Sequence, residues 1–202
     1  NANALAASAV GYNNTAGGVG SSTIGYNNTA TNENASAFGY GNTAGGLASS
    51  AFGFSNTASG DNANAFGYNN IASGSKSNVF GTGNTVSGSS STAVGTANEV
   101  AAENSTAIGN NNTISSSAEN SAALGNNISI SLKDSVALGN NSTATAINSV
   151  TGNSSYTKWA GVSDVVGVVS VGSSGADPSD TKCSGRAGQR NFYRCRQRQP
   201  AV

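Results

Sequence analysis

A glycine recurs at intervals of 14 residues along most of this chain, each time directly after a large apolar residue. Two extra residues near Ser116–Ser117 interrupt the spacing once, and it then returns to 14. A period this strict indicates a solenoid, in which one repeat is one coil and buries its apolar side chains only by stacking on its neighbours. The ten glycines are Gly11, Gly25, Gly39, Gly53, Gly67, Gly81, Gly95, Gly109, Gly125 and Gly139.

Each repeat is too short for a pair of helices and suits two short strands joined by two turns. Thr, Val, Ile, Phe and Tyr gather near the glycines, and these residues favour strands. The pairs Gly17–Gly18, Gly45–Gly46 and Asn69–Asn70 predict tight turns with positive φ between the strands. We therefore expect an all-β chain whose coils stack as parallel strands.

Two neighbouring positions before each glycine are apolar, the first small and the second large. Neighbouring side chains on a strand point to opposite faces of the sheet. The small residues, mostly Ala, are therefore expected to fill a narrow interior, and the large residues to form a ladder on the outside. A long exposed apolar ladder indicates a partner, and here it favours packing against copies of the same chain. The ladder comprises Val10, Ile24, Phe38, Phe52, Phe66, Phe80, Val94, Ile108, Leu124 and Leu138.

The composition argues against several classes of function. The 202 residues carry no net charge and no His, which is the commonest general base and metal ligand. We therefore predict no catalytic residue, no metal and no cofactor. Neutrality gives no reason to expect nucleic-acid binding, and no apolar run is long enough for direct membrane insertion. The first residues lack the pattern of a signal peptide, so we expect a processed chain or part of a longer one.

The repeats Asn104–Ile114 (NSTAIGNNNTI) and Asp134–Ala144 (DSVALGNNSTA) resemble the head repeat of YadA-like trimeric autotransporter adhesins, which has the form NSVAIGxxS. The segment Gly167–Gly175 (GVVSVGSSG) resembles the family's entry to the neck below the head. The resemblance implies a left-handed parallel β-roll of 14-residue repeats, assembled as a homotrimer. It also implies a head of ten repeats at 1–148, the end of the head and the neck entry at 149–176, and a further segment at 177–202.

The resemblance further implies a bacterial surface adhesin rather than an enzyme, anchored to the outer membrane in the full-length protein. Such a head would attach to host extracellular matrix or cell-surface receptors, mediate autoaggregation and contribute to virulence. Repeated weak contacts would give it avidity. The later repeats stay closest to the form that supports collagen binding in this family. The predicted ligand-binding residues are Asp134, Ser135, Val136, Ala137, Leu138, Gly139 and Ser142.

The composition changes at Asp177, and residues 177–202 hold both cysteines, both prolines and a cluster of Arg. A basic tail, a disulfide or a metal-binding Cys pair are possible interpretations, although Cys183 and Cys195 lack the further ligands of a zinc site. Another interpretation fits better. Codons that encode Arg194–Val202, read one base later, give Asp-Ala-Val-Asn-Gly-Ser-Gln-Leu-Tyr, which resembles the family's neck. We therefore hypothesise a frameshift near Asp177, and sequencing the gene there tests it.

Two further columns leave alternatives open. An aromatic residue follows the glycine in the first five repeats, and the rings either stack to stabilise adjacent coils or form a binding surface; stacking is favoured. Thr recurs in register at Thr15, Thr29, Thr43, Thr57, Thr85 and Thr113, with Ile71 and Glu99 interrupting the column. A regular Thr face is typical of ice-binding solenoids, so a monomeric ice-binding protein is the alternative function. Trp159 is expected to cap the end of the roll.

Overall fold

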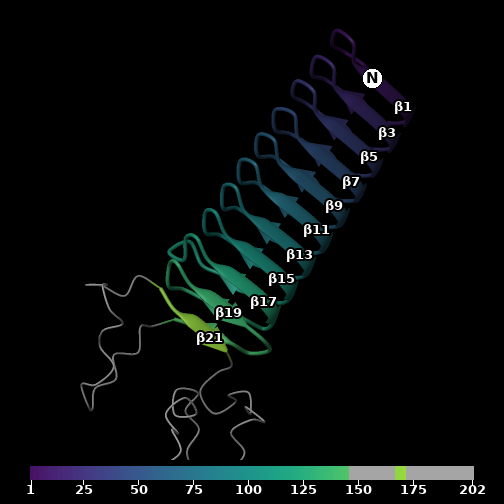
Figure 1. Cartoon of the computed structure of the whole chain (residues 1–202). Helices are drawn as coiled ribbons and strands as arrows, with labels where there is room; N and C mark the ends of the chain where they lie inside the picture. The colour runs from purple at the N-terminus through teal and green to yellow at the C-terminus, as the bar shows by residue number, and fades with distance from the viewer. Residues whose placement is uncertain (146–166, 172–202) are drawn as a thin grey trace, which may run out of the picture.

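The computed structural model describes residues 1–145 and 167–171. Its coils stack into a β-solenoid (Figure 1), and each coil contributes one long and one short strand to two parallel sheets. The long strands form an 11-stranded sheet of β1 (Ser8–Tyr12), β3 (Ser22–Tyr26), β5 (Ser36–Tyr40), β7 (Ser50–Phe54), β9 (Asn64–Tyr68), β11 (Asn78–Thr82), β13 (Thr92–Thr96), β15 (Thr106–Asn110), β17 (Ala122–Asn126), β19 (Val136–Leu138) and β21 (Val169–Val171).

The short strands form a 10-stranded sheet of β2 (Thr15–Ala16), β4 (Thr29–Ala30), β6 (Thr43–Ala44), β8 (Thr57–Ala58), β10 (Ile71–Ala72), β12 (Thr85–Val86), β14 (Glu99–Val100), β16 (Thr113–Ile114), β18 (Ser129–Ile130) and β20 (Thr143–Ala144). We number the coils by their long strands, so that coil 1 holds β1 and β2 and coil 10 holds β19 and β20. The predicted all-β solenoid is confirmed.

The pairing register follows the sequence period. Ser22 pairs with Ser36, and Ser36 with Ser50, so each step along the sheet is one 14-residue repeat. Between β15 and β17 the step is longer, because Thr106 pairs with Ala122. The two extra residues lie in the turn at 115–121, and the strands on either side keep their register, as the sequence predicts.

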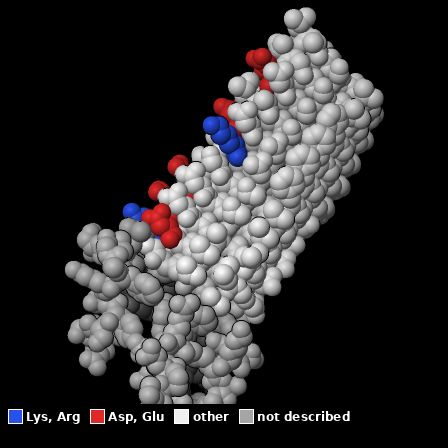
Figure 2. All heavy atoms as spheres, viewed as in Figure 1, with Lys and Arg blue, Asp and Glu red and all other residues white. Residues whose placement is uncertain are grey.

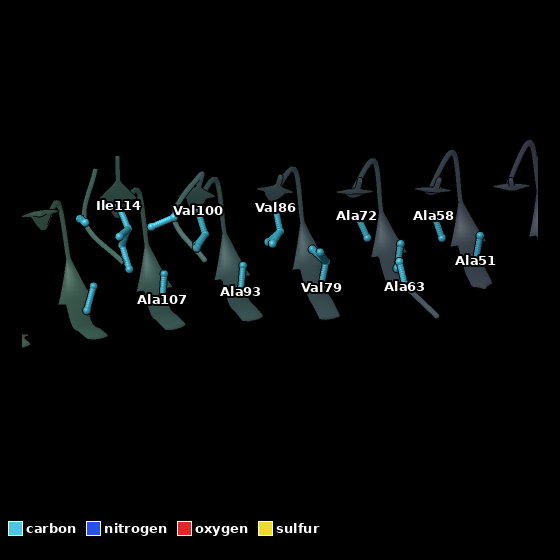
Figure 3. Close-up of a cluster of buried hydrophobic side chains, with 14 of the residues drawn as sticks. Ala51, Ala58, Ala63, Ala72, Val79, Val86, Ala93, Val100, Ala107 and Ile114 are labelled. Carbon is cyan, nitrogen blue, oxygen red and sulfur yellow. The ribbon is translucent and has the colours of Figure 1, made fainter. Parts of the chain in front are cut away.

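The interior of the roll is narrow and filled mainly by Ala, Val and Ile (Figure 3). On the long strands Ala37, Ala51 and Ala65 point inward and are fully buried. The large residue that follows the inward residue lies on the outer face: Phe38, Phe52 and Phe66 are half-buried, and the other seven range in exposure from 58% at Val10 to 36% at Leu138. The predicted separation of small and large columns onto opposite faces is confirmed.

The recurring glycine is required for two reasons: its backbone has positive φ, and the next coil leaves no room for a Cβ atom. Gly67 has φ +124°, and a Cβ built there would lie 2.0 Å from the carbonyl oxygen of Gly81 in the next coil. The same clash recurs from Gly11 to Gly125, because each of these glycines stacks on the glycine of the next coil. Any side chain at this position would therefore push two coils apart.

The predicted positive-φ turns are right at one pair and wrong at two. Asn69 has φ +53°, but neither Gly17–Gly18 nor Gly45–Gly46 has positive φ. In these two turns the positive φ occurs two residues later, at Gly20 in the first and at Ala48 in the second. Gly46 serves close approach instead, since a Cβ there would lie 2.0 Å from the carbonyl oxygen of Gly60.

The long sheet continues past coil 10. Val169, Ser170 and Val171 pair in parallel with Val136, Ala137 and Leu138. The first part of the expected neck entry therefore forms one more strand of the head sheet. Trp159, the segment after Val171 and the hypothesised frameshifted tail lie outside the described residues, so the division into three segments stays a prediction.

Candidate adhesive surface

The outer face of the long sheet carries two apolar columns. The first, here called the outer apolar column, is the ten-residue ladder from Val10 to Leu138 named above; it runs through all ten coils. Four of its rings, from Phe38 to Phe80, lie in a row with centroids 4.7–5.3 Å apart; the Phe38–Phe52 pair is tilted by 39°, and the other two pairs are stacked. Val171 pairs with Leu138 and extends the column onto β21.

The second column, here called the aromatic ladder, lies two residues further along the long strands of coils 1–5. Its rings are nearly parallel, with interplanar angles of 5–15° and centroid separations of 4.8–5.3 Å. The predicted stacking is confirmed. Each ring remains 43–68% exposed, so stacking does not bury the ladder. Its members are Tyr12, Tyr26, Tyr40, Phe54 and Tyr68.

A ladder of buried Asn side chains supports this face from inside. Asn56 is typical: its backbone N–H donates to Asn42 Oδ1 at 3.0 Å, and its Nδ2 donates to the carbonyl of Phe52 at 2.9 Å and of Gly67 at 2.7 Å. Buried polar groups are costly unless paired, and the ladder pairs them from coil to coil. Its members are Asn14, Asn28, Asn42, Asn56, Asn70, Asn84, Asn98 and Asn112.

Sequence reasoning missed this ladder because it treated the Asn residues as turn formers. The signal was present, since these Asn residues recur every 14 residues. In an Asn-Asn pair such as Asn69–Asn70, the first residue takes the positive φ and the second is buried in the ladder. Ile128 and Ser142 replace Asn at this position in coils 9 and 10, so the ladder ends after coil 8.

Charged side chains lie along one edge of the roll (Figure 2). Among the described residues, all but one of the charged side chains occupy the turns that lead from a short strand to the next long strand. The exception is Glu99 on β14. The two apolar columns are therefore uncharged, and they lie at the third and fifth residues of the long strands, beyond the turns that form this edge. The edge residues are Glu33, Asp61, Lys76, Glu103, Glu119, Lys133 and Asp134.

The structure brings some of the predicted ligand-binding residues to the surface and leaves others inside. Asp134, Leu138 and Gly139 are exposed, and Val136 is half-buried. Ala137, Ser135 and Ser142 are buried. Ser135 Oγ accepts a hydrogen bond from the backbone N–H of Val168 at 3.1 Å and so ties β21 to coil 10.

The Thr column lies on the short sheet. Each short strand has two residues, of which one faces outward and the other, such as Ala44 or Ala58, is buried. One Thr per coil therefore forms a single column rather than the paired columns typical of ice-binding solenoids. Ile71 and Glu99 stand in that column and are exposed, as the sequence indicates.

Comparison with known families identifies the repeat. The model of the YadA head domain repeat matches residues 16–42, 44–70, 87–112 and 133–150. Residues 16–150 belong to the YadA head family. One unmatched stretch, 113–132, contains the two-residue insertion. No curated protein matches the chain.

YadA heads are adhesins rather than enzymes, so membership indicates an adhesin-like role for this chain at the cell surface. The repeat differs from the NSVAIGxxS form at its last position, where eight coils carry Asn in place of Ser. No group of three or more potential metal ligands occurs within 1–145 and 167–171. In the same ranges no helix is long and apolar enough to cross a membrane.

Proposed function

We propose that this chain is the head of a homotrimeric bacterial adhesin, anchored to the outer membrane elsewhere in the full-length protein. The observation that supports trimerisation is the outer apolar column. It is uncharged, it spans all ten coils, and most of its members are more than a third exposed. Apolar ladders of this length on soluble proteins are usually covered by a partner.

The experiment is sedimentation or light scattering of the whole chain over a range of concentrations. A trimer has a mass of about 59 kDa, three times the 19.7 kDa of one chain. A chain that stays monomeric at tens of micromolar contradicts the proposed assembly. The matched variant is Phe52→Thr, which removes one ring of the column and should weaken the trimer.

The proposed ligands are host extracellular matrix proteins, with collagen first, or cell-surface receptors, and the head would also support autoaggregation and virulence. Contact at the later repeats would fall on the exposed Asp134, Leu138 and Gly139. The sharpest variant is Asp134→Asn, because Asn104 and Asn120 occupy the same turn position with positive φ in other coils. It removes the charge and keeps the fold. Unchanged binding to immobilised collagen would exclude Asp134 as a ligand contact.

A further inference from the structure

The aromatic ladder presents ring edges rather than ring faces. Successive rings cover each other's faces at 4.8–5.3 Å, so between Tyr12 and Tyr68 no face is free. Cations and stacked ligands bind aromatic rings through the face. The exposed strip therefore suits a partner that packs against a row of ring edges and phenol oxygens.

The period of the ladder selects among partners. Its rings repeat at the coil spacing, about 4.8 Å for hydrogen-bonded strands. A helix repeats at about 5.4 Å per turn and a polyproline helix at about 9.3 Å, so either drifts out of register over five rings. A single extended strand presents side chains of one face about 6.7 Å apart. Another stack of β-coils has the same repeat, and a second copy of this chain supplies one.

The interior changes at the coil where the ladder ends. In coils 1–5 the inward residue of the short strand is Ala, as at Ala58 and Ala72. In coils 6–9 it is larger, as at Val86 and Ile114 (Figure 3). In the same coils the ladder position becomes Thr82, Thr96, Asn110 and Asn126. The apolar side chains that differ between the halves therefore lie outside in coils 1–5 and inside in coils 6–9, while the outer apolar column runs through both halves. The aromatic rings of coils 1–5 become buried only where another chain covers them.

The area and position of the ladder fit a chain-to-chain contact. Its five rings, each about half exposed and each about 150–250 Å² in full, offer roughly 500 Å². A standard interface takes about 800 Å² per partner and surrounds an apolar centre with a polar rim. The exposed Asn13, Asn27 and Asn69 lie beside the ladder as such a rim. The outer apolar column lies about 7 Å away on the same face, so a chain that packs on the column also reaches the ladder.

We propose that the neighbouring chain of the trimer covers the aromatic ladder. Coils 1–5 then form the main contact between chains, and the head self-associates without the residues after Val171. This inference rests on the proposed trimer and adds to it which half of the head holds the chains together. It concerns a position that the NSVAIGxxS repeat leaves unspecified.

The first experiment replaces the centre of the ladder in the whole chain with Tyr26→Thr, Tyr40→Thr and Phe54→Thr. Thr is the matched residue because Thr82 and Thr96 occupy the same position in coils 6 and 7. The chain concentration at which half of the chains form the trimer should rise at least tenfold, because Tyr residues buried at interfaces are frequent binding hot spots. The reverse change, Thr82→Tyr with Thr96→Tyr, should lower it several-fold. Ile71→Thr, on the short sheet, is the control and should leave it unchanged.

The second experiment needs no variant. Tetranitromethane nitrates accessible tyrosines, and mass spectrometry measures the nitration rate of Tyr12, Tyr26, Tyr40 and Tyr68. The rate is compared between a concentrated sample, in which the trimer forms, and a dilute sample, in which the chains are separate. Protection in the trimer, by fivefold or more, supports the inference. A trimer whose ladder is nitrated at the monomer rate overturns it and leaves the proposed assembly standing. Absence of any trimer overturns both. A triple variant that keeps its trimer but loses larger assemblies also overturns it, because the ladder would then join separate trimers.

Discussion

Coils 1–5 and coils 6–10 share one backbone and differ in where they keep their apolar side chains. The glycine column runs through both halves, and the buried Asn ladder reaches coil 8. In the first half the interior is narrow and the outside carries two apolar columns. In coils 6–9 the inward residue of the short strand is Val or Ile, and from coil 6 onward Thr and Asn replace the aromatic ladder outside.

This difference shows that the residues that stabilise the coil and the residues that determine its outer surface occupy different positions of the repeat. Among the positions that set the coil, Gly with its positive φ is present in all ten coils and the paired Asn in eight of them. The ladder position and the inward short-strand position vary without altering the register, since Tyr68 pairs with Thr82 as regularly as Tyr26 pairs with Tyr40. A chain can therefore place its adhesive or assembling surface in one half while the other half is stabilised from within.

The largest expected effect is in the shared framework. Gly67→Ala in coil 5 and Gly109→Ala in coil 8 should each cost more than about 4 kcal/mol, because the Cβ would meet a neighbouring carbonyl oxygen at 2.0 and 1.8 Å. Urea unfolding measures the cost. Gly83→Ala is the control, since its φ is +63° but no atom lies within 4 Å of the added Cβ, and it should cost about 1–2 kcal/mol. A tolerated Gly67→Ala would mean that the halves do not share a rigid framework.

The interior provides the next largest effect and tests the comparison directly. Ile114→Ala removes a fully buried side chain from the second half and should cost about 2–5 kcal/mol. Ala58→Val adds two methyl groups at the same position in the first half and should cost about 1–3 kcal/mol through overpacking. Thermal unfolding of both variants gives the two values. Stabilisation by Ala58→Val would show that coils 1–5 have unused interior space, against the comparison drawn above.

The Asn ladder provides a smaller effect. Asn112→Ala leaves the carbonyl of Gly125 without the Asn112 Nδ2 donor and the backbone N–H of Ile128 without its acceptor, Asn112 Oδ1, and should cost about 1–3 kcal/mol. Asn110→Ala, an exposed position in the same coil, should cost less than about 0.5 kcal/mol. Equal losses in the two variants, measured by denaturant unfolding, would mean that the ladder adds nothing beyond helping the turn to form.

The fold was predictable from the sequence because one coil dictates the next. The spacing of Gly39, Gly53 and Gly67 gives the register, and the Ala-Phe pairs give the two faces of each strand. The turns were less predictable. A glycine such as Gly46 serves close approach and not positive φ, and sequence alone does not separate those reasons. At the surface, the apolar column was predictable from the sequence. The sequence also led to the prediction of Ser135, Ala137 and Ser142 as ligand contacts, whereas the coil places these three side chains inside.

The smallest expected effect concerns the short sheet and the alternative of ice binding. Ile71 is 42% exposed on β10 and interrupts a column of Thr that runs from Thr15 to Thr85. Ile71→Thr completes six coils of that column, and it should change stability by less than about 0.5 kcal/mol because the side chain faces outward. An adhesive head predicts no thermal hysteresis before or after the change, since a single Thr column lacks the paired spacing of an ice-binding face. Hysteresis that appears in Ile71→Thr and disappears in Thr57→Ala would instead assign the binding function to the short sheet.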